Sequence, residues 1–354
     1  MIVNQWLPTA HYGDAMGDST RRVAGLLRRM GHTSEVYAID VDAALAQDVR
    51  PFTHPGALAG DVTIFHYGIQ SRMTAAFRSL PGRRVLQYHN VTPAEFFAPW
   101  DPHLFLLATR GREELATLAG HVDVALGDSE YNRRELEETG FARTGIFPVA
   151  VDLTRVCASA RSPALEAILD DGLMNFLFVG RIVPNKKIED HIRLAAFYSR
   201  YVDAGCRFIF VGRYDVLPGY YSAIRALMAR HGLRGDRVIF TGAVPDQELA
   251  IYYQYADVYI SLSEHEGFCV PLVEAMAAGV PVLAYAAAAV PDTLGGAGVQ
   301  FAPKDLECAA ALLDELTFDD ELRAHVIAGQ RRRVADFGDA RISRDLAALI
   351  GSLS

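Results

Sequence analysis

The sequence predicts an α/β protein made of two Rossmann-like, doubly wound domains. Short apolar runs alternate with amphipathic helical patterns along all 354 residues, as expected of βαβ units with parallel sheets. The chain is longer than an ordinary single domain, and its 51% hydrophobic residues suffice for two cores. The strand candidates also fall into two sets of about six, separated by a polar segment near 150–170.

The elements follow in order along the chain. Candidate strands of the first half lie at 2–7, 35–39, 62–66, 84–89, 122–127 and 145–149. Those of the second half lie at 175–180, 207–212, 237–241, 257–262, 280–284 and 298–301, followed by helices at 305–317, 319–336 and 340–352. We therefore expect an N-terminal Rossmann-like domain at 1–165, a second Rossmann-like domain at 166–335, and a last helix at 336–354 that crosses back to the first domain.

Composition excludes several classes of protein. A net charge of -9 argues against a general nucleic-acid binder. The four cysteines form no CxxC pair, which disfavours a zinc site and a disulfide framework and fits a reducing compartment. The N-terminus resembles no signal peptide, and no run of 18 apolar residues is present. We expect a cytoplasmic protein, either fully soluble or peripheral on the inner face of the membrane.

The segment from Ser261 to Ala284 predicts a strand, a loop, a helix and a second strand. Pro271 suits the first helical turn and Gly279 its end. The loop Gly267–Val270 then lies at a helix N-terminus, where free N–H groups favour an anion. Glu266 and Glu274 flank this loop, and sugar or ribose hydroxyls are suitable partners for such carboxylates. Alternatively, both are ordinary acids at a helix start.

The segment 176–190 predicts a strand that ends at Gly180 and is followed by Arg181 and Lys186. These cations can neutralise the charge that a diphosphate gains as it leaves a sugar. The alternative for such a segment is a solvated basic loop.

Taken together, these segments resemble family 4 of the retaining GT-B glycosyltransferases, also called glycosyl transferases group 1. Glu266-x7-Glu274 is similar to the family's E-x7-E signature, and Arg181-x4-Lys186 to its diphosphate clamp. The resemblance implies two domains facing a central cleft, with 1–165 on the acceptor side and 166–335 binding the nucleotide sugar. It places Glu266 at the donor sugar and Glu274 at the ribose. Cys269 departs from the family, in which glycine is common. Further donor contacts are implied for Gly180, Gly212, Val244, Glu248, Leu249, Gly267, Phe268, Cys269 and Val270.

The first half carries looser matches to the same family. His89 follows a predicted strand; a lone histidine there is otherwise a structural residue. The resemblance implies that it contacts the donor sugar and counts with Glu266, Arg181 and Lys186 as catalytic. Thr92 and Glu95 predict a capping box for a helix that follows. The loop after the first strand supplies Gly13 to the donor, and the acceptor side includes Asp14, Gly17, Asn90, Ser129 and Asn132, of which Ser129 is alternatively an N-cap.

The predicted function is transfer of a hexose from a UDP- or GDP-linked sugar to a hydroxyl of a glycan or lipid-linked glycan, with retention, as in bacterial surface polysaccharide synthesis. We expect neither a cofactor nor a metal, and no nucleic-acid partner. Retention is open between a front-face step and a double displacement. Alternative functions are a phosphorylase or epimerase of the same fold, or a non-catalytic nucleotide-sugar-binding protein. A dehydrogenase is disfavoured because no G-x-G-x-x-G follows the first strand.

The helix predicted at 19–30 has an apolar face of Val23, Leu26, Leu27 and Met30. Its opposite face carries Arg21, Arg22, Arg28 and Arg29, and Arg83 and Arg84 add charge elsewhere in the domain. This pattern predicts either docking to anionic lipid or a solvated basic face.

Overall fold

The computed structural model describes residues 1–157 and 159–353. The chain divides into two compact units, one of residues 1–98, 102–152 and 336–354, the other of residues 99–101 and 153–335. Each unit is built around one parallel sheet, so the predicted α/β fold class is confirmed. The chain passes from the first unit to the second after Asp152, within the polar segment 150–170, and α14 belongs to the first unit.

The first unit has a seven-stranded sheet of order β3-β2-β1-β4-β5-β6-β7. Its strands are β1 Val3–Ala10, β2 Val36–Val41, β3 Val49–Pro51, β4 Val62–Tyr67, β5 Arg83–Tyr88, β6 Val124–Gly127 and β7 Thr144–Ile146. Its α-helices are α1 Ala15–Arg29, α2 Met73–Arg78, α3 Pro102–Ala116, α4 Glu130–Glu138 and α14 Asp339–Gly351.

The second unit has a six-stranded sheet of order β10-β9-β8-β11-β12-β13. Its strands are β8 Met174–Val179, β9 Cys206–Val211, β10 Val238–Gly242, β11 Val258–Ser261, β12 Val282–Tyr285 and β13 Val299–Phe301. Its α-helices are α5 Thr154–Cys157, α6 Pro163–Leu169, α7 Ile188–Tyr201, α8 Pro218–Arg230, α9 Asp246–Gln254, α10 Val270–Ala278, α11 Val290–Leu294, α12 Leu306–Phe318 and α13 Asp320–Val334.

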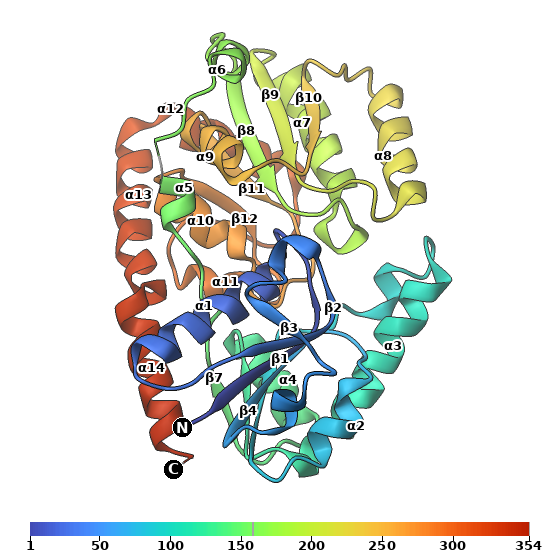
Figure 1. The fold of residues 1–354 in the computed structure, drawn as a ribbon. Helices are drawn as coiled ribbons and strands as arrows, with labels where there is room; N and C mark the ends of the chain where they lie inside the picture. The colour runs from blue at the N-terminus through green and yellow to red at the C-terminus, as the bar shows by residue number, and fades with distance from the viewer. Residues whose placement is uncertain (158, 354) are drawn as a thin grey trace. The chain divides into compact units, whose positions relative to one another are not determined.

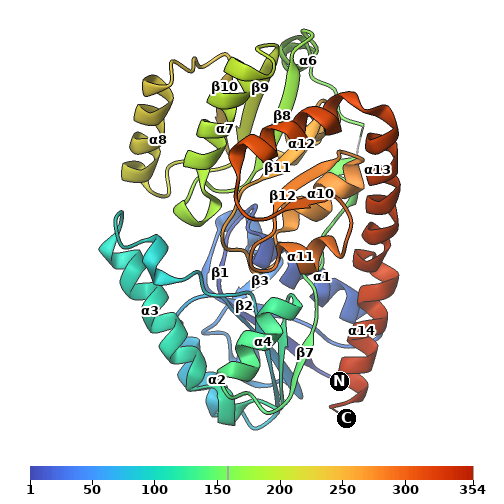
Figure 2. The same ribbon diagram turned by 180° about the vertical axis from the view of Figure 1, so that it is seen from behind.

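Both sheets are covered by helices on their two faces, because strands of a parallel sheet are apolar on both sides. In the first unit, α1 and α14 pack on one face through Val23, Leu27 and Leu346, and α2, α3 and α4 pack on the other through Phe77 and Leu136. In the second unit, α9 and α10 lie in front of the sheet in Figure 1, and α12 lies in front in Figure 2.

The strand order reverses once in each sheet, and each of these points marks where a ligand is expected in its own unit. In the first sheet the reversal lies between β1 and β4, and in the second between β8 and β11. Ligands of open α/β sheets bind at the carboxyl ends of the strands beside such a point. The loops that follow β1, β4, β8 and β11 are therefore where chemistry is expected.

Two local predictions in the first unit need correction. The capping box at Thr92 does not form: residues Ala94–Phe96 make one 3-10 turn without a side-chain cap, and Pro99 prevents its extension. The helix predicted at 19–30 begins earlier, at Ala15, because the Asp14 carboxylate caps it by accepting the Gly17 N–H at 3.1 Å.

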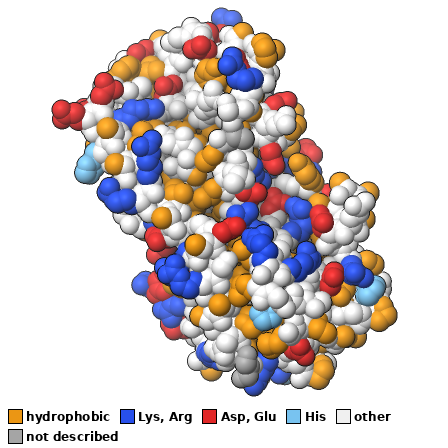
Figure 3. Space-filling view, turned by 60° about the vertical axis from the view of Figure 1, so that its left-hand side comes forward, with side chains coloured by type: hydrophobic (Ala, Val, Ile, Leu, Met, Phe, Trp, Pro, Cys, Tyr) orange, Lys and Arg blue, Asp and Glu red, His pale blue; other side chains and the backbone are white. Residues whose placement is uncertain are grey.

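The basic face of α1 is an ion-paired face. Arg22 contacts Asp339 at 2.5 Å and Asp152 at 3.4 Å, and Arg29 also reaches Asp339 at 3.2 Å. On the face in Figure 3, basic and acidic side chains are likewise interspersed. These pairs favour the interpretation of α1 as a solvated face. No helix in the described ranges is both long and apolar enough to cross a bilayer.

Candidate active site

The centre of the candidate site is an ion pair at the switch point of the second sheet. Lys186 lies at the end of the loop after β8, and Glu266 lies in the loop after β11. The Lys186 Nζ is 2.5 Å from Oε2 of Glu266, and Glu266 is only 6% exposed. The Lys186 ammonium has three N–H donors, so two remain for a ligand. Two residues that the sequence placed separately are therefore brought together.

The loops after β8 and β11 are tied to one another by a buried amide. Asn185 donates from Nδ2 to the carbonyl of His265 at 2.9 Å, and its own carbonyl accepts from the Glu264 N–H at 2.9 Å. Lys187 pairs with Glu264 at 3.1 Å. The two hydrogen bonds of Asn185 hold the Lys186–Glu266 pair in place before any ligand arrives, which favours a preorganised anion site.

Arg181 is the second cation at this edge and differs from Lys186 in its surroundings. It is exposed, and within the described residues its guanidinium makes no hydrogen bond or ion pair. The backbone beside Arg181 requires glycine, because a Cβ on Gly212 would lie 2.2 Å from the carbonyl oxygen of Gly180. Gly180 and Gly212 therefore allow two strand ends to approach closely, leaving the Arg181 side chain available for a diphosphate.

The loop before α10 has the geometry of an anion-binding helix start. Pro271 lies in the first turn and Gly279 ends the helix with φ of 77°. Cys269 is the N-cap residue and adopts φ of 71°, a conformation that favours glycine. A cysteine in place of the common glycine therefore costs backbone strain at this position. Burial and the nearby Glu266 carboxylate raise the pKa of the Cys269 thiol well above its usual value, so it stays neutral.

Glu274 is almost fully buried, at 1% exposure, and faces two partners. Tyr253 of α9 donates to its Oε2 at 3.0 Å, and the Arg155 guanidinium of α5 pairs with its Oε1. Burial and the Glu274 carboxylate raise the Tyr253 pKa well above 10, so the phenol remains a donor. A carboxylate accepts about four hydrogen bonds. Arg155 donates two to Glu274 and Tyr253 donates one, which leaves capacity for about one ribose hydroxyl.

The remaining predicted donor contacts surround this centre. Phe268 is buried, and its carbonyl accepts a hydrogen bond from the Thr293 hydroxyl of α11. Gly267, Val270 and Val244 are half-buried, Glu248 at the start of α9 is exposed, and Leu249 is buried beneath it.

In the first unit, His89 belongs to a buried chain of polar groups. Its Nδ1 donates to Asp128 at 2.8 Å, and its Nε2 lies 2.9 Å from Nδ1 of His66. Nε2 of His66 is in turn 2.8 Å from Oε1 of Gln5. Full burial lowers the His66 pKa well below 6.5, so His66 is neutral. Both ring nitrogens of His89 are thus engaged, and contact with a sugar requires its Nε2 to leave His66.

The distances between Gln5, His66 and His89 are consistent with two arrangements of their protons. With Gln5 Oε1 accepting from His66 Nε2, the other nitrogen of His66 accepts a second proton of His89. Among the described residues, the Gln5 Nε2 has no hydrogen-bond partner. Rotating the amide turns this group toward His66, and His89 then carries only the proton that it shares with Asp128.

The predicted acceptor-side residues have structural contacts in the first unit. The Ser129 hydroxyl caps α4 by accepting the Asn132 N–H at 3.2 Å, which is the N-cap alternative. Asn132 is fully buried; its Oδ1 accepts from Asn90 at 2.8 Å and its Nδ2 donates to the Tyr88 carbonyl at 3.2 Å. Asn132 therefore positions Asn90 in this structure, and Asp14 caps α1. Gly17 is buried, whereas Gly13 is exposed with φ of 74°.

Sequence reasoning missed Arg155, Tyr253, His66 and Asp128. Arg155 lies 119 residues from Glu274 in the chain, in a segment without a motif, and nothing in the sequence indicated it. Asp128 directly follows β6, beside the predicted Ser129, and its position at a strand end was a usable signal.

A buried histidine in the second unit gives this unit a predicted pH dependence. His191 of α7 donates from Nδ1 to the Lys187 carbonyl at 3.1 Å and accepts the Leu262 N–H at Nε2. Burial lowers its pKa from 6.5 to about 4. The unfolded chain therefore takes up this proton first as pH falls, so the stability from His191 is complete above pH 6.5 and decreases toward pH 4.

We expect the unfolding free energy of the wild type to fall by about 2 kcal/mol more between pH 7.5 and 5 than that of His191→Gln. Urea unfolding at both pH values measures this difference. The exposed His325→Gln is the matched control and keeps the wild-type dependence. Equal pH dependence of the wild type and His191→Gln contradicts the assignment.

Comparison with known proteins gives one match within the second unit and another over nearly the whole chain. A family model described as glycosyl transferases group 1 matches residues 168–333. A GDP-mannose-dependent alpha-mannosyltransferase of Mycolicibacterium smegmatis is 34% identical over 94% of this chain and 89% of its own length. The serotype-specific mannosyltransferase WbdA of Escherichia coli is 30% identical over 43% of this chain, and that match spans about a fifth (19%) of its length.

Solved structures resemble the whole chain. The structure of Anabaena Alr3699/HepE in complex with UDP and glucose has a TM-score of 0.77 and 18% identity, covering 100% of both chains. That of WaaG, a glycosyltransferase involved in lipopolysaccharide biosynthesis, has a TM-score of 0.72 and 16% identity, covering 98% of this chain and 99% of the other. At these identities the likeness establishes the fold.

Proposed function

We propose that this chain, which belongs to the glycosyl transferases group 1 and has the GT-B fold, transfers mannose from GDP-mannose to a hydroxyl of a glycan acceptor with retention of configuration. The choice of mannose and guanosine is supported by the relative named for GDP-mannose, which matches nearly the whole chain. The WbdA relatives, also named as mannosyltransferases, support the same sugar.

The observation that carries the proposal is the Lys186–Glu266 pair at the ends of β8 and β11. A cation and a buried carboxylate at one switch point match the diphosphate and the adjoining sugar of a nucleotide sugar. Lys186 and the unpaired Arg181 bind the diphosphate, whose charge grows as the bond to the sugar breaks. Glu266 accepts from sugar hydroxyls, and Glu274, oriented by Tyr253, accepts from the ribose.

The transfer then needs no protein nucleophile. The acceptor oxygen bonds to the anomeric carbon on the face from which the diphosphate departs. The bond from that carbon to the phosphate oxygen breaks, and the released phosphate takes the acceptor proton. Atoms and charge balance without a further reactant, and Arg181 and Lys186 stabilise the charge on the leaving group.

The first unit supplies the acceptor side in this proposal. Its carboxyl edge presents the loop after β1, with Gly13 and Asp14, and His89 after β5. Asp128 fixes the ring of His89 through Nδ1, and Nε2 of this ring reaches a sugar hydroxyl when it leaves His66. We assign the acceptor to the glycans of polysaccharide synthesis, as the name of another relative, an O-antigen chain mannosyltransferase of Escherichia coli, suggests.

A donor panel tests the proposal. Purified enzyme is incubated with mannan oligosaccharide and either GDP-mannose, UDP-glucose or UDP-N-acetylglucosamine, and released nucleotide and product configuration are measured. We expect GDP release from GDP-mannose alone and an α-linked product. Preference for a UDP-sugar contradicts the donor assignment, and a β-linked product contradicts retention.

Activity is expected to survive excess EDTA. Arg181, Lys186 and the N-terminus of α10 already supply positive charge to the diphosphate. The measurement compares the rate with GDP-mannose before and after chelation. Complete loss with EDTA and recovery on adding Mg²⁺ or Mn²⁺ contradicts this expectation.

A further inference from the structure

Glu274 receives its hydrogen bonds unevenly on its two carboxylate oxygens. Arg155 donates from Nε to Oε1 at 3.2 Å, and one of its terminal nitrogens donates to the same oxygen. Tyr253 donates to the other oxygen, Oε2, at 3.0 Å. Each carboxylate oxygen has two lone pairs, so Oε1 is saturated and Oε2 keeps one open position. A hydroxyl that binds Glu274 therefore finds its acceptor at Oε2.

The position of Glu274 on α10 suits a ribose. It is the fifth residue of this helix, which begins at Val270. Each residue adds 1.5 Å along a helix axis, so Glu274 lies about 6 Å from the N-terminus that we assign to the diphosphate. In a nucleoside diphosphate the ribose follows the diphosphate directly. Tyr253, the partner of Oε2, belongs to α9, whose start carries the predicted donor contacts Glu248 and Leu249.

Arg155 is held from two sides, which fixes the direction of its hydrogen bonds. Besides Glu274 of α10, its guanidinium lies 3.7 Å from Oδ1 of Asp246, the first residue of α9. Cys157, at the end of α5, also reaches α10, with its Sγ 3.5 Å from the carbonyl oxygen of Ala277. The short helix α5 thus packs against both α9 and α10. A planar guanidinium with contacts on both sides has little freedom to turn.

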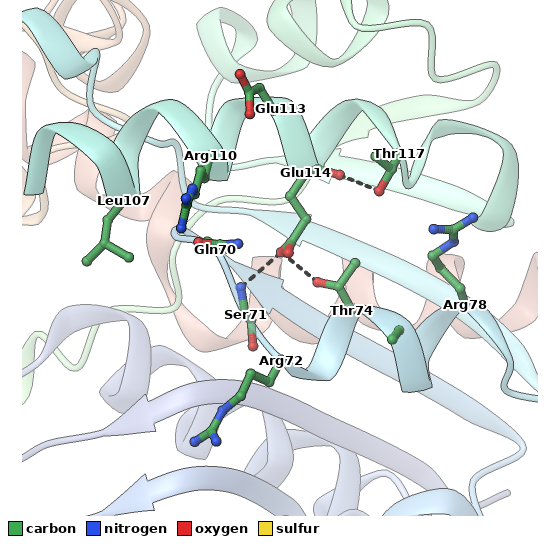
Figure 4. A pocket seen from close by; sticks show the side chains of 11 residues that line it. Gln70, Ser71, Arg72, Thr74, Arg78, Leu107, Arg110, Glu113, Glu114 and Thr117 are labelled. Atoms are coloured by element: carbon green, nitrogen blue, oxygen red, sulfur yellow. Dashed lines mark hydrogen bonds between the residues drawn. The ribbon is translucent and has the colours of Figure 1, made fainter. Parts of the chain in front are cut away.

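A carboxylate of the first unit shows that neutral donors can satisfy a less buried acid. Glu114 of α3 is half-buried, and its Oε1 accepts from the Ser71 N–H at 2.9 Å and the Thr74 hydroxyl at 2.7 Å (Figure 4). Within residues 1–157 and 159–353, no cation pairs with Glu114. Glu274 is far more buried, and a carboxylate so far from water requires an opposite charge. Arg155 supplies this charge and uses only Oε1 to do so.

We propose that Arg155 is a positioning residue of the donor site. It fixes Glu274 so that Oε2 accepts one ribose hydroxyl, and the site thereby selects ribonucleotides over nucleotides that lack this hydroxyl. The inference rests on the proposed function, in which Glu274 faces the ribose. Arg155 acts through Glu274 and needs no contact with the nucleotide. Turning the carboxylate so that Oε2 points elsewhere would break two charge-assisted hydrogen bonds, which holds the acceptor in one direction.

Selectivity for the ribose hydroxyls tests this role. GDP and 2′,3′-dideoxy-GDP, which lacks both hydroxyls, are titrated calorimetrically into the wild type and Arg155→Gln. The wild type is expected to bind GDP at least about tenfold more tightly, because the analogue cannot donate to the charged acceptor. In Arg155→Gln this preference is expected to fall to about threefold or less, since Oε2 is no longer held toward the ribose. The affinity for dideoxy-GDP is expected to stay close to its wild-type value.

The preference for GDP separates positioning from support of the fold. If Arg155 only stabilised the second unit, its replacement would weaken both nucleotides by the same factor. Arg155→Lys keeps a positive charge beside Glu274 and so protects the fold, but an ammonium does not reproduce the planar pair of donors, and the preference is expected to fall here too. The matched control is Arg207→Gln, which removes a buried arginine that pairs with Asp171 at 2.7 Å near the start of β9. This variant is expected to keep the full preference.

Failure of this inference is distinguishable from failure of the proposed function. Equal affinity of the wild type for GDP and dideoxy-GDP overturns the inference, as does the full preference in either Arg155 variant, and GDP binding leaves the proposed donor standing in both cases. If the wild type binds UDP and not GDP, the donor assignment fails, and UDP with 2′,3′-dideoxy-UDP then decides the role of Arg155 in the same way. Absence of binding by both GDP and UDP overturns the two together.

Discussion

Replacing Lys186 with alanine is expected to lower kcat by about 10²- to 10³-fold with GDP-mannose. The ammonium group stabilises charge that develops only as the diphosphate departs, so the effect falls mainly on turnover. The change also leaves the 6% exposed Glu266 without its cation, and the free energy of unfolding is expected to fall. Steady-state kinetics and urea unfolding measure the two effects separately.

Arg181→Ala is expected to show a similar kinetic loss without the loss of stability, because its guanidinium has no ion pair within the described residues. The matched control is Lys187→Ala, which removes a neighbouring ammonium that pairs with Glu264. It is expected to keep kcat within a few-fold of the wild type. Wild-type turnover by Lys186→Ala, or an equal loss in Lys187→Ala, contradicts the role of Lys186.

Replacing Asp128 with asparagine is expected to lower kcat by about 10- to 100-fold. The carboxylate now accepts the proton on His89 Nδ1 at 2.8 Å and a proton of Gln87 at 2.6 Å. The amide of an asparagine at this position can donate to Nδ1 of His89, so the His89 proton moves to Nε2. His89 then donates to His66, and the hydrogen bonds through His66 reverse their direction. Asp128 is a positioning residue, since it acts through His89.

Kinetics as a function of pH, together with GDP binding, distinguishes this role from a general loss of structure. The pH profile of kcat is expected to shift, while GDP binding by the second unit stays the same. Asp123→Asn is the control, because Asp123 pairs with Arg83 at 3.0 Å at the other end of β6. An unchanged pH profile in Asp128→Asn indicates that the His66–His89–Asp128 chain has no part in transfer.

Twelve of the thirteen strands in the described residues overlap a predicted strand, because the sequence there is an apolar run bounded by turn residues. The exception is β3, whose three residues include the exposed Arg50 and Pro51 and bury only Val49. Such a strand gives no periodic signal, and it forms only because the edge of β2 offers it hydrogen bonds.

In the candidate site too, the sequence predicts one part and not the other. Arg181, Lys186, Glu266 and Glu274 belong to local motifs, so the sequence alone is enough to propose each of them. It did not predict the pairing of Lys186 with Glu266, 80 residues apart, or of Arg155 with Glu274. These contacts depend on the strand order, which brings the ends of β8 and β11 together, and strand order is not encoded in any one segment.

The central claim is that the second unit binds the nucleoside diphosphate of the donor through Glu274 and its neighbours. Isothermal titration of GDP into the wild type and Glu274→Ala tests it most directly, because neither acceptor nor turnover is needed. The account predicts one GDP per chain and binding at least about tenfold weaker in the variant, since a ribose hydroxyl loses its charged acceptor. Equal GDP affinity of the two proteins, or no binding of GDP or UDP to the wild type, would contradict it.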